Sequence, residues 1–270
     1  MTPDPSHAVA VVFLSDLRLV SSVGALGAYG FWLLTGRSSA ASLARLALVV
    51  VLLGSLGMMG LAGLSELPLR EWFLVAWVMV WLLGSLVFNL AALGGAVAAG
   101  AVLLIGWSYV APAGWGGASG ADVPDLVRYW SSLRDALAAV GAACVSLAIG
   151  AGVVRAVVGD RRTSQAYAPT DLVAVASLYA RLGAGLAALG LLAAGLAWRH
   201  DPGGGGLHLV RGVGMAWLLG VALAWLTGPR AGLVPAWRLV LLAVLGGGAC
   251  GWLFAGARLA AYLTPGIAAP

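Results

Sequence analysis

The sequence predicts an all-α fold, a polytopic integral membrane bundle of about eight transmembrane helices. Of its 270 residues, 61% are hydrophobic and 9% are charged, and the mean hydropathy is +0.99. A water-soluble core cannot absorb that much apolar surface. Apolar runs of about 20 residues, the length that crosses a bilayer, recur between short polar segments. We therefore expect a single transmembrane domain over 1–270, with no soluble domain.

The predicted spans are separated by connections that carry most of the polar residues. The spans cover approximately 17–34, 43–64, 72–89, 93–111, 131–158, 172–198, 209–227 and 237–262. A polar hinge, 65–71, follows the second span, and a glycine-rich loop at 112–128 precedes the fifth. The run 72–111 is too long for one crossing, so we expect a turn near Asn89. The N-terminal MTPDPSH lacks the basic region of a secretory signal, so the first apolar run is expected to be retained.

Small residues recur along three spans and predict close helix contacts. They are Gly24, Gly27 and Gly30 in the first span, Ala142, Ser146 and Gly150 in the fifth, and Gly247, Gly251 and Ala255 in the last.

Asp16 and Arg18 are expected at the outer edge of the first span.

The arginines indicate orientation. All 15 basic residues are Arg, and they are scattered between the spans, so they form no one-sided patch for nucleic acid. The connections with Arg37 and Arg45, with 155–162 and with 230–238 fall on one side of an even-span model, and nearly all acids fall on the other. Because basic loops favour the cytosol, we expect a multi-pass plasma-membrane protein with both termini and the 199–211 loop outside.

The hairpin 178–225 carries the clearest candidate site. Its cap contains four consecutive glycines, 203–206, and the two interior histidines, His200 and His208. Imidazole nitrogens bind iron and zinc, so both histidines are candidate ligands for a metal or haem. They are eight positions apart and lack an obvious third ligand, and the alternative is that they are solvated loop residues.

Aromatic residues provide a second set of candidates. Phe73, Trp77 and Trp81 are spaced by four residues and share a helix face, so they predict either a porphyrin or quinone shelf or a packing stripe. Trp130 and Trp198 fall near the expected outer boundary, where an aromatic belt is the alternative to a ligand contact.

Three charged residues near or within the spans are also candidates. Arg181 lies about three turns into the sixth span, where an unpaired guanidinium costs several kcal/mol. It is expected to face a polar interior or to snorkel, and to bind a haem propionate, a lipid phosphate or another helix. Arg134 and Asp135 are expected to join an outer polar cluster or to anchor the start of the fifth span.

Short segments of the chain resemble the cytochrome c assembly family of haem-handling membrane proteins. The matching segments are Leu178-Tyr179, Arg181, Gly183 and 195–198 in the sixth span, Asp201-Pro202 in the loop, 216–218 in the seventh span, 64–74 with Pro68, and Tyr129-Trp130 with Leu133. The resemblance covers about 43–265. It implies a tryptophan-rich loop that holds haem before the last span. Family members use span-end histidines as axial ligands, whereas the corresponding positions here hold Gly54 or Ser55, Arg134 or Asp135, Trp225 and Arg258. The chain is therefore similar to a degenerate member that lacks the family's standard ligands.

The resemblance implies a non-catalytic role in haem handling or cytochrome c maturation, with haem as the possible cofactor. The sequence holds no Walker, HExxH, GxSxG or paired-carboxylate pattern. Expected partners are the lipid bilayer and another maturation or respiratory membrane subunit. The candidate cofactor-binding residues are Arg181, Trp77, Trp81, Trp130, Arg134, Trp198, His200, Asp201 and His208, with His200 and His208 as metal ligands.

The first alternative is a structural or regulatory membrane subunit without haem. The second is a small-solute transporter, which would show broken helices and inverted repeats. No repeat is evident in the sequence.

Overall fold

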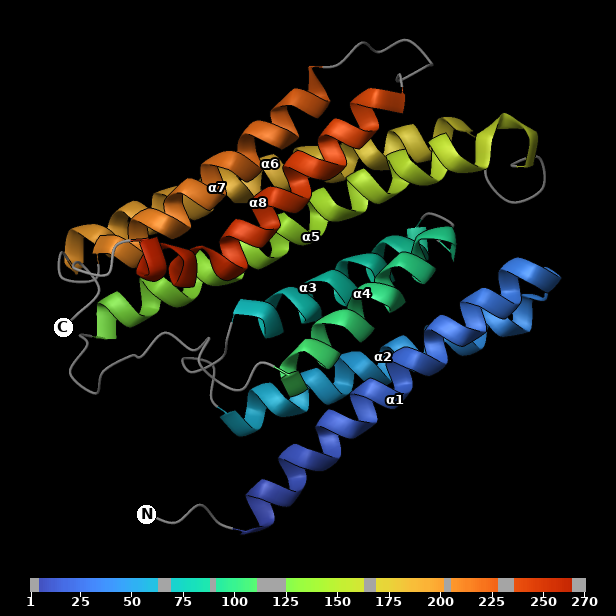
Figure 1. Ribbon diagram of the computed structural model, residues 1–270, viewed down its shortest axis with the longest axis horizontal. Helices are drawn as coiled ribbons and strands as arrows, with labels where there is room; N and C mark the ends of the chain where they lie inside the picture. The colour runs from blue at the N-terminus through green and yellow to red at the C-terminus, as the bar shows by residue number, and fades with distance from the viewer. Residues whose placement is uncertain are drawn as a thin grey trace. The chain divides into compact units, whose positions relative to one another are not determined.

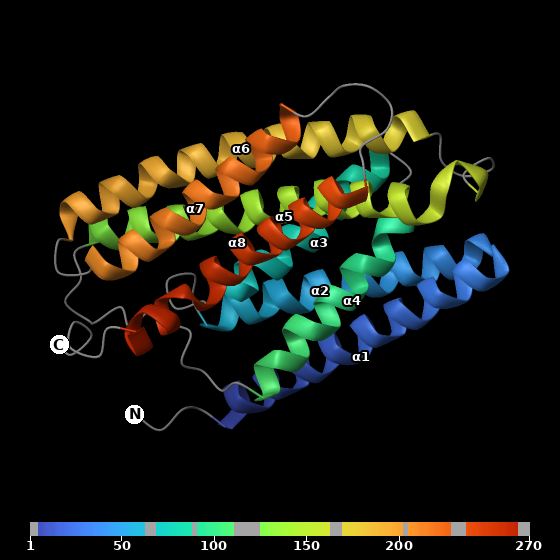
Figure 2. The same ribbon diagram turned by 45° about the horizontal axis from the view of Figure 1, so that its top comes forward.

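The all-α prediction is confirmed. The computed structural model describes residues 5–62, 69–87, 91–110, 125–162, 169–201, 205–227 and 236–263. These residues form eight helices (Figures 1 and 2): α1 (Pro5–Thr35), α2 (Ser38–Ala62), α3 (Leu69–Val87), α4 (Ala91–Val110), α5 (Asp125–Arg162), α6 (Pro169–His200), α7 (Gly205–Leu226) and α8 (Ala236–Leu263).

Six of these helices, α1 to α3 and α5 to α7, are long and apolar enough to cross a membrane. The remaining two, α4 and α8, contain shorter apolar stretches, Leu93–Gly106 and Arg238–Leu253. The helices follow the predicted spans in order. The chain is therefore a multi-pass membrane protein.

Two helices begin before the predicted edges of the first and third spans. The first helix begins at Pro5, so Arg18 lies inside α1 and is buried. The predicted hinge extended to Glu71, but α3 begins at Leu69 and Glu71 lies buried in its first turn. The prediction places charges at span boundaries because a charge is costly inside an apolar run. That argument does not hold when two opposite charges neutralise each other within the bundle.

The chain divides into two compact units. The first unit (Met1–Ser119) contains α1 to α4, and the second unit (Gly120–Pro270) contains α5 to α8. In the first unit, α1 packs against α2 and α4, and α3 packs against the same two helices. In the second unit, α5 packs against α6 and α8, and α7 packs against those two. The prediction of one domain over 1–270 stays a prediction.

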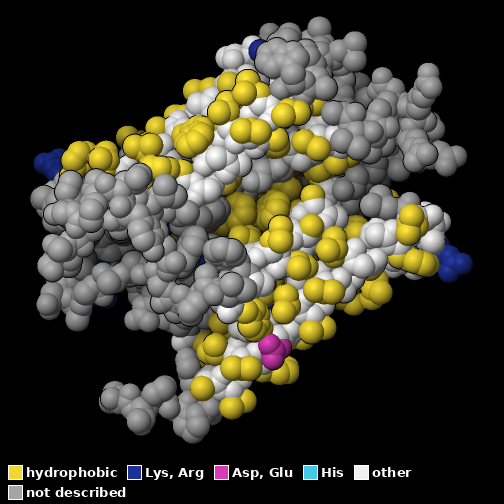
Figure 3. All heavy atoms as spheres, viewed as in Figure 1, with side chains coloured by type: hydrophobic (Ala, Val, Ile, Leu, Met, Phe, Trp, Pro, Cys, Tyr) yellow, Lys and Arg dark blue, Asp and Glu magenta, His cyan; other side chains and the backbone are white. Residues whose placement is uncertain are grey.

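The described surface is rich in large apolar side chains (Figure 3). Leu34 and Leu86 are 88% and 82% exposed, and exposed Leu, Val or Phe residues occur on α1 to α8. A soluble monomer rarely exposes contiguous apolar patches of more than a few hundred Å². Lipid contact accounts for this surface.

The predicted small-residue contacts were wrong for the first span and for Gly247 and Gly251 of the last span; the side chain of Ala255, the third residue predicted there, lies outside the described residues. A Cβ added at Gly24, Gly27 or Gly30 would meet nothing within 4 Å, and the same holds for Gly247 and Gly251. Regular spacing places glycines on one face of a helix, but it does not tell whether that face meets protein or lipid. The close approach occurs between α5 and α6, where a Cβ at Gly183 would lie 2.7 Å from Val145 Cγ2 and 3.3 Å from the Gly141 carbonyl oxygen.

Candidate functional site

A polar cluster lies where α5 and α7 begin and α6 ends. It consists of Arg134, Asp135, Asp201, His208 and Arg211. Arg134, His208 and Arg211 are only 2%, 4% and 8% exposed. Arg134 and Asp135 lie in the third turn of α5, His208 in the first turn of α7, and Asp201 directly after α6. All five belong to the second unit.

The hydrogen bonds in this polar cluster fix the state of His208. Arg134 Nε donates to Asp135 Oδ1 at 2.8 Å, and Arg134 Nη1 donates to His208 Nδ1 at 2.7 Å. Because a guanidinium has no acceptor, Nδ1 must be the accepting nitrogen and the ring proton must lie on Nε2. His208 Nε2 then donates to Asp201 Oδ2 at 3.3 Å. His208 is therefore neutral here. Its two hydrogen bonds link the beginning of α7 to the beginning of α5 and to the residue after α6.

Arg211 is the member of the polar cluster with unused donors. Its Nε and Nη1 have no hydrogen-bond partner among the described residues, although the side chain is buried. Asp135 and Arg134 are close enough to act on its charge, in opposite directions. A buried cation with unsatisfied donors costs several kcal/mol unless an anion compensates it.

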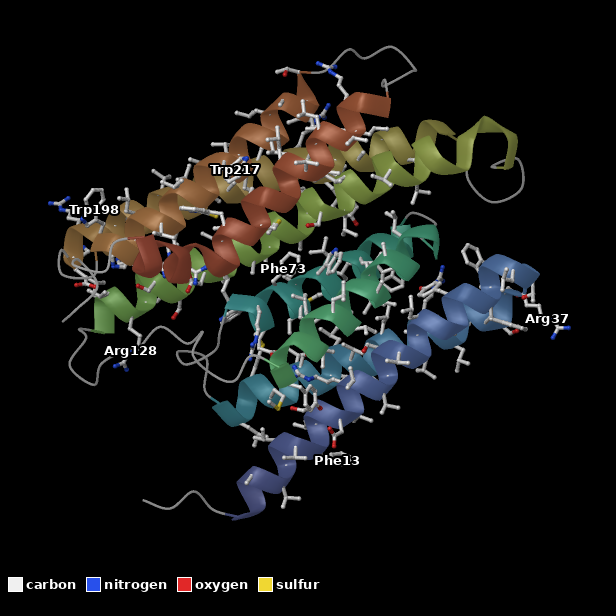
Figure 4. The ribbon with its side chains drawn as sticks, viewed as in Figure 1. Phe13, Arg37, Phe73, Arg128, Trp198 and Trp217 are labelled. Carbon is white, nitrogen blue, oxygen red and sulfur yellow. The ribbon has the colours of Figure 1, made fainter. Side chains whose placement is uncertain are left out.

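An apolar groove of about 280 Å³ lies between α6 and α7 and ends at His208. It is lined by Leu191, Ala194, Gly195 and Trp198 of α6 and by His208, Leu209, Gly212, Val213 and Ala216 of α7. Trp198 is 50% exposed near the end of α6 (Figure 4). Ligand pockets for small molecules usually hold about 300–1,000 Å³. At about 280 Å³ the groove lies just below that range, so it has room for only part of an apolar molecule, such as an acyl chain or the edge of a ring.

Several predicted site residues come together at this end of the second unit. Arg134, Asp201 and His208 are hydrogen-bonded, and Trp198 shares the groove with His208. Trp130 is half-buried one turn before Arg134 on α5, so the two share a helix face.

The two histidines are in different environments. His200 is exposed as the last residue of α6, whereas His208 is buried. Within the described parts of the chain, no group of three or more His, Cys, Asp or Glu side chains could hold a metal ion. Joint metal ligation by His200 and His208 stays a prediction.

Arg181 lies far from the polar cluster. It is exposed on α6, 19 residues before His200, which corresponds to about 28 Å along a helix. The expected alternatives were a polar interior and snorkelling, and the exposed position agrees with snorkelling. Arg181 therefore does not contribute to the same site as His208.

The tryptophans of α3 belong to the first unit and pack against helices. Trp81 is fully buried and meets Tyr29 of α1 edge-on, with ring centroids 6.1 Å apart. Glycines of α4 make room for both rings, because a Cβ at Gly94 would overlap Trp81 and a Cβ at Gly100 would overlap Trp77. This environment favours the packing stripe over the porphyrin shelf.

Sequence reasoning missed a buried ion pair in the first unit. Arg18 is 1% exposed, and its Nη1 donates to Glu71 Oε2 at 2.6 Å and to Ser55 Oγ at 3.3 Å. The available signal was that ionisable residues inside apolar runs need partners. The same signal marks Arg211, which was not singled out.

No family model, no curated protein and no solved structure matches this chain. The resemblance to the cytochrome c assembly family therefore rests on the short segments quoted above.

Proposed function

We propose that this is a non-catalytic, haem-handling membrane protein of the cytochrome c assembly type. In this proposal the polar cluster and the α6–α7 groove receive a porphyrin or the partner protein that carries it. The partner would be another maturation or respiratory membrane subunit. The proposed site faces the outside of the plasma membrane, with both termini on that side.

One observation carries the proposal: an apolar groove with a tryptophan at its edge ends at a buried Arg134–His208 hydrogen bond. Porphyrins combine a flat apolar ring with carboxylates, so they need an apolar surface next to fixed cationic donors. Trp198 offers the surface, and the cations are Arg134, which is bonded to the groove residue His208, and Arg211 of the same polar cluster; neither arginine lines the groove itself.

The residues fit the porphyrin's edge and carboxylates better than they fit its iron. Both ring nitrogens of His208 are engaged within the polar cluster, so ligation by His208 would require both hydrogen bonds to break. His200 is the exposed last residue of α6, so in this proposal it is the histidine that would bind the iron. Bound haem would supply its own redox and ligand chemistry, while this chain would orient and present it.

The test is purification of the full chain in mild detergent, addition of haem and measurement of the visible spectrum. We expect a Soret shift that saturates with haem. His200→Ala is expected to change the band position if His200 reaches the iron. Trp198→Ala is expected to weaken binding, and His7→Ala serves as the matched histidine control. A colourless protein that does not shift the spectrum of added haem would contradict the proposal.

A structural or regulatory membrane subunit is the second candidate function. Arg18–Glu71 supports it, because this chain also uses a buried arginine simply to join helices within the first unit. A colourless protein that co-purifies with one membrane subunit in constant ratio, and that leaves the haem spectrum unchanged, would favour this function.

A further inference from the structure

The two units share one arrangement of helices. In each unit, the first and third helices both pack against the second and fourth. The correspondence runs in chain order: α1 with α5, α2 with α6, α3 with α7 and α4 with α8. This arrangement alone is common in four-helix bundles, so the sequence must provide the independent evidence.

Aligned by this helix order, the sequence contains a repeat that was not evident without the structure. Residues 79–84 of α3 read MVWLLG, and residues 215–220 of α7 read MAWLLG, 136 positions later. In the preceding pair of helices, 44–46 and 180–182 both read ARL, and they are also 136 positions apart. The same separation therefore recurs in two consecutive helix pairs, α2 with α6 and α3 with α7.

The matching tryptophans both contact a glycine of the following helix, although Trp81 is fully buried and Trp217 is 37% exposed. Trp81 of α3 lies against Gly94 of α4, and Trp217 of α7, which is labelled in Figure 4, lies against Gly248 of α8. A Cβ at Gly94 would lie 2.7 Å from the Trp81 ring, and a Cβ at Gly248 would lie 3.0 Å from the Trp217 ring. Local sequence and tertiary contact thus agree.

Each copy buries an arginine from its first helix. Residues 15–18 read SDLR and residues 131–134 read SSLR, ending at Arg18 and Arg134; these two segments are 116 and not 136 positions apart. Both arginines bond to a residue in the first turn of the third helix of their unit, Glu71 in one case and His208 in the other. By its place among the helices, and not by a constant step along the chain, the polar cluster of the second unit corresponds to the Arg18–Glu71 pair.

The two counterparts differ in charge. Moving 136 positions along the chain from Glu71 leads to Leu207, so the second copy has lost the buried carboxylate. The same step from Val75, which is buried and apolar, leads to Arg211. The second copy has thus exchanged a built-in anion for an additional buried cation.

The carboxylates of the polar cluster, Asp135 and Asp201, form their hydrogen bonds with residues other than Arg211. Asp135 bonds to Arg134 Nε and Asp201 bonds to His208 Nε2. Two donor nitrogens of Arg211 remain without a partner in the described structure. A guanidinium presents its donors as a planar fork that matches the oxygens of a carboxylate or phosphate.

We infer that the second copy of a duplicated four-helix unit has turned a buried ion pair into a binding site for the anionic oxygen group of an amphiphile. Arg211 and Arg134 bind the carboxylate or phosphate, and the groove beside Trp198 and His208 holds the apolar part. This inference goes beyond the haem proposal, because it concerns the anionic group and holds equally for a lipid phosphate.

The experiment measures the apparent melting temperature of the full chain in detergent against three anionic probes: inorganic phosphate, phosphatidylglycerol and iron-free protoporphyrin. Diacylglycerol and protoporphyrin dimethyl ester are the controls that lack the anionic group. We expect at least one anionic probe to stabilise the protein in a saturable way while its control does not. Stabilisation by phosphate indicates a free anion, by phosphatidylglycerol a lipid, and by protoporphyrin a porphyrin carboxylate. No stabilisation by any of the three overturns the inference.

Variants locate the effect. Arg211→Gln is expected to raise the probe concentration needed for half-maximal stabilisation at least about tenfold, as for loss of a charge-assisted hydrogen bond. Arg199→Gln removes an exposed cation from the end of α6 and is expected to leave the response unchanged. Leu207→Glu restores the carboxylate of the first copy, so it is expected to raise the melting temperature without ligand and to abolish the response. A normal response in Arg211→Gln overturns the inference. If that variant does not fold, a normal response in Leu207→Glu overturns it instead.

Discussion

Removing the carboxylate of Glu71 tests whether the first unit depends on its buried ion pair. Arg18 is 1% exposed and the Glu71 side chain 11%, so solvent cannot replace the lost partner. After Glu71→Gln the guanidinium would keep a neutral amide and the hydroxyl of Ser55, which lies 3.3 Å away. Breaking one side of a buried pair costs about 3–5 kcal/mol. At about 2–4 °C per kcal/mol for a chain of roughly this size, the melting temperature should fall by roughly 6–20 °C.

The assay is thermal unfolding in detergent, followed by tryptophan fluorescence. Asp16→Asn is the matched control, because Asp16 is exposed and accepts a hydrogen bond from Tyr109 at 2.7 Å. Exposed interactions contribute about 0–1 kcal/mol, so that variant should lose at most about 4 °C. The double variant Arg18→Met/Glu71→Leu should regain most of the loss, because it removes both buried charges. Equal losses in Glu71→Gln and Asp16→Asn, or no recovery in the double variant, would refute the reasoning.

Two further predictions concern packing and orientation. Gly183→Ala should destabilise the second unit by about 1–3 kcal/mol, because the new methyl would press against Val145, and Val145→Ala should restore part of the loss. Gly185→Ala should be neutral or slightly stabilising in the same unfolding assay, because a Cβ there meets nothing, and an equal loss in both glycine variants would contradict the packing account. In a chain without its native cysteines, a membrane-impermeant maleimide applied to intact cells should label His200→Cys and not Arg37→Cys, both positions being exposed. The reverse pattern would overturn the proposed orientation.

The sequence predicted the helices well because apolar run length is a local property. Lipid requires every crossing segment to satisfy its own backbone hydrogen bonds, so apolar runs and helices coincide. The exceptions occur where tertiary contacts override the local signal. Arg18 looked like an end of a span because its partner is 53 positions away.

The candidate site was only partly predictable for the same reason. Composition and loop position singled out His208 and Arg134 separately, but nothing local indicated that they would share a hydrogen bond across 74 positions. Arg211 was overlooked because an arginine close to a span end normally reaches water. The repeat was invisible until the helix order aligned its short matches. It is a direct repeat, because each unit has an even number of helices among its described residues, so it is not the inverted repeat expected of a transporter.

The position of Arg181 also determines how deep α6 sits in the bilayer. Arg181 and Trp198 are both exposed and 17 residues apart, which corresponds to about 26 Å of helix. That length is close to the roughly 30 Å thickness of the hydrocarbon layer, so a guanidinium and an indole would each meet a headgroup region. A shift of α6 along the membrane normal would move either the Arg181 guanidinium or the Trp198 indole into the hydrocarbon layer. The groove beside Trp198 would therefore lie at the depth of the lipid headgroups. The charged group of an amphiphile in the membrane lies at the same depth.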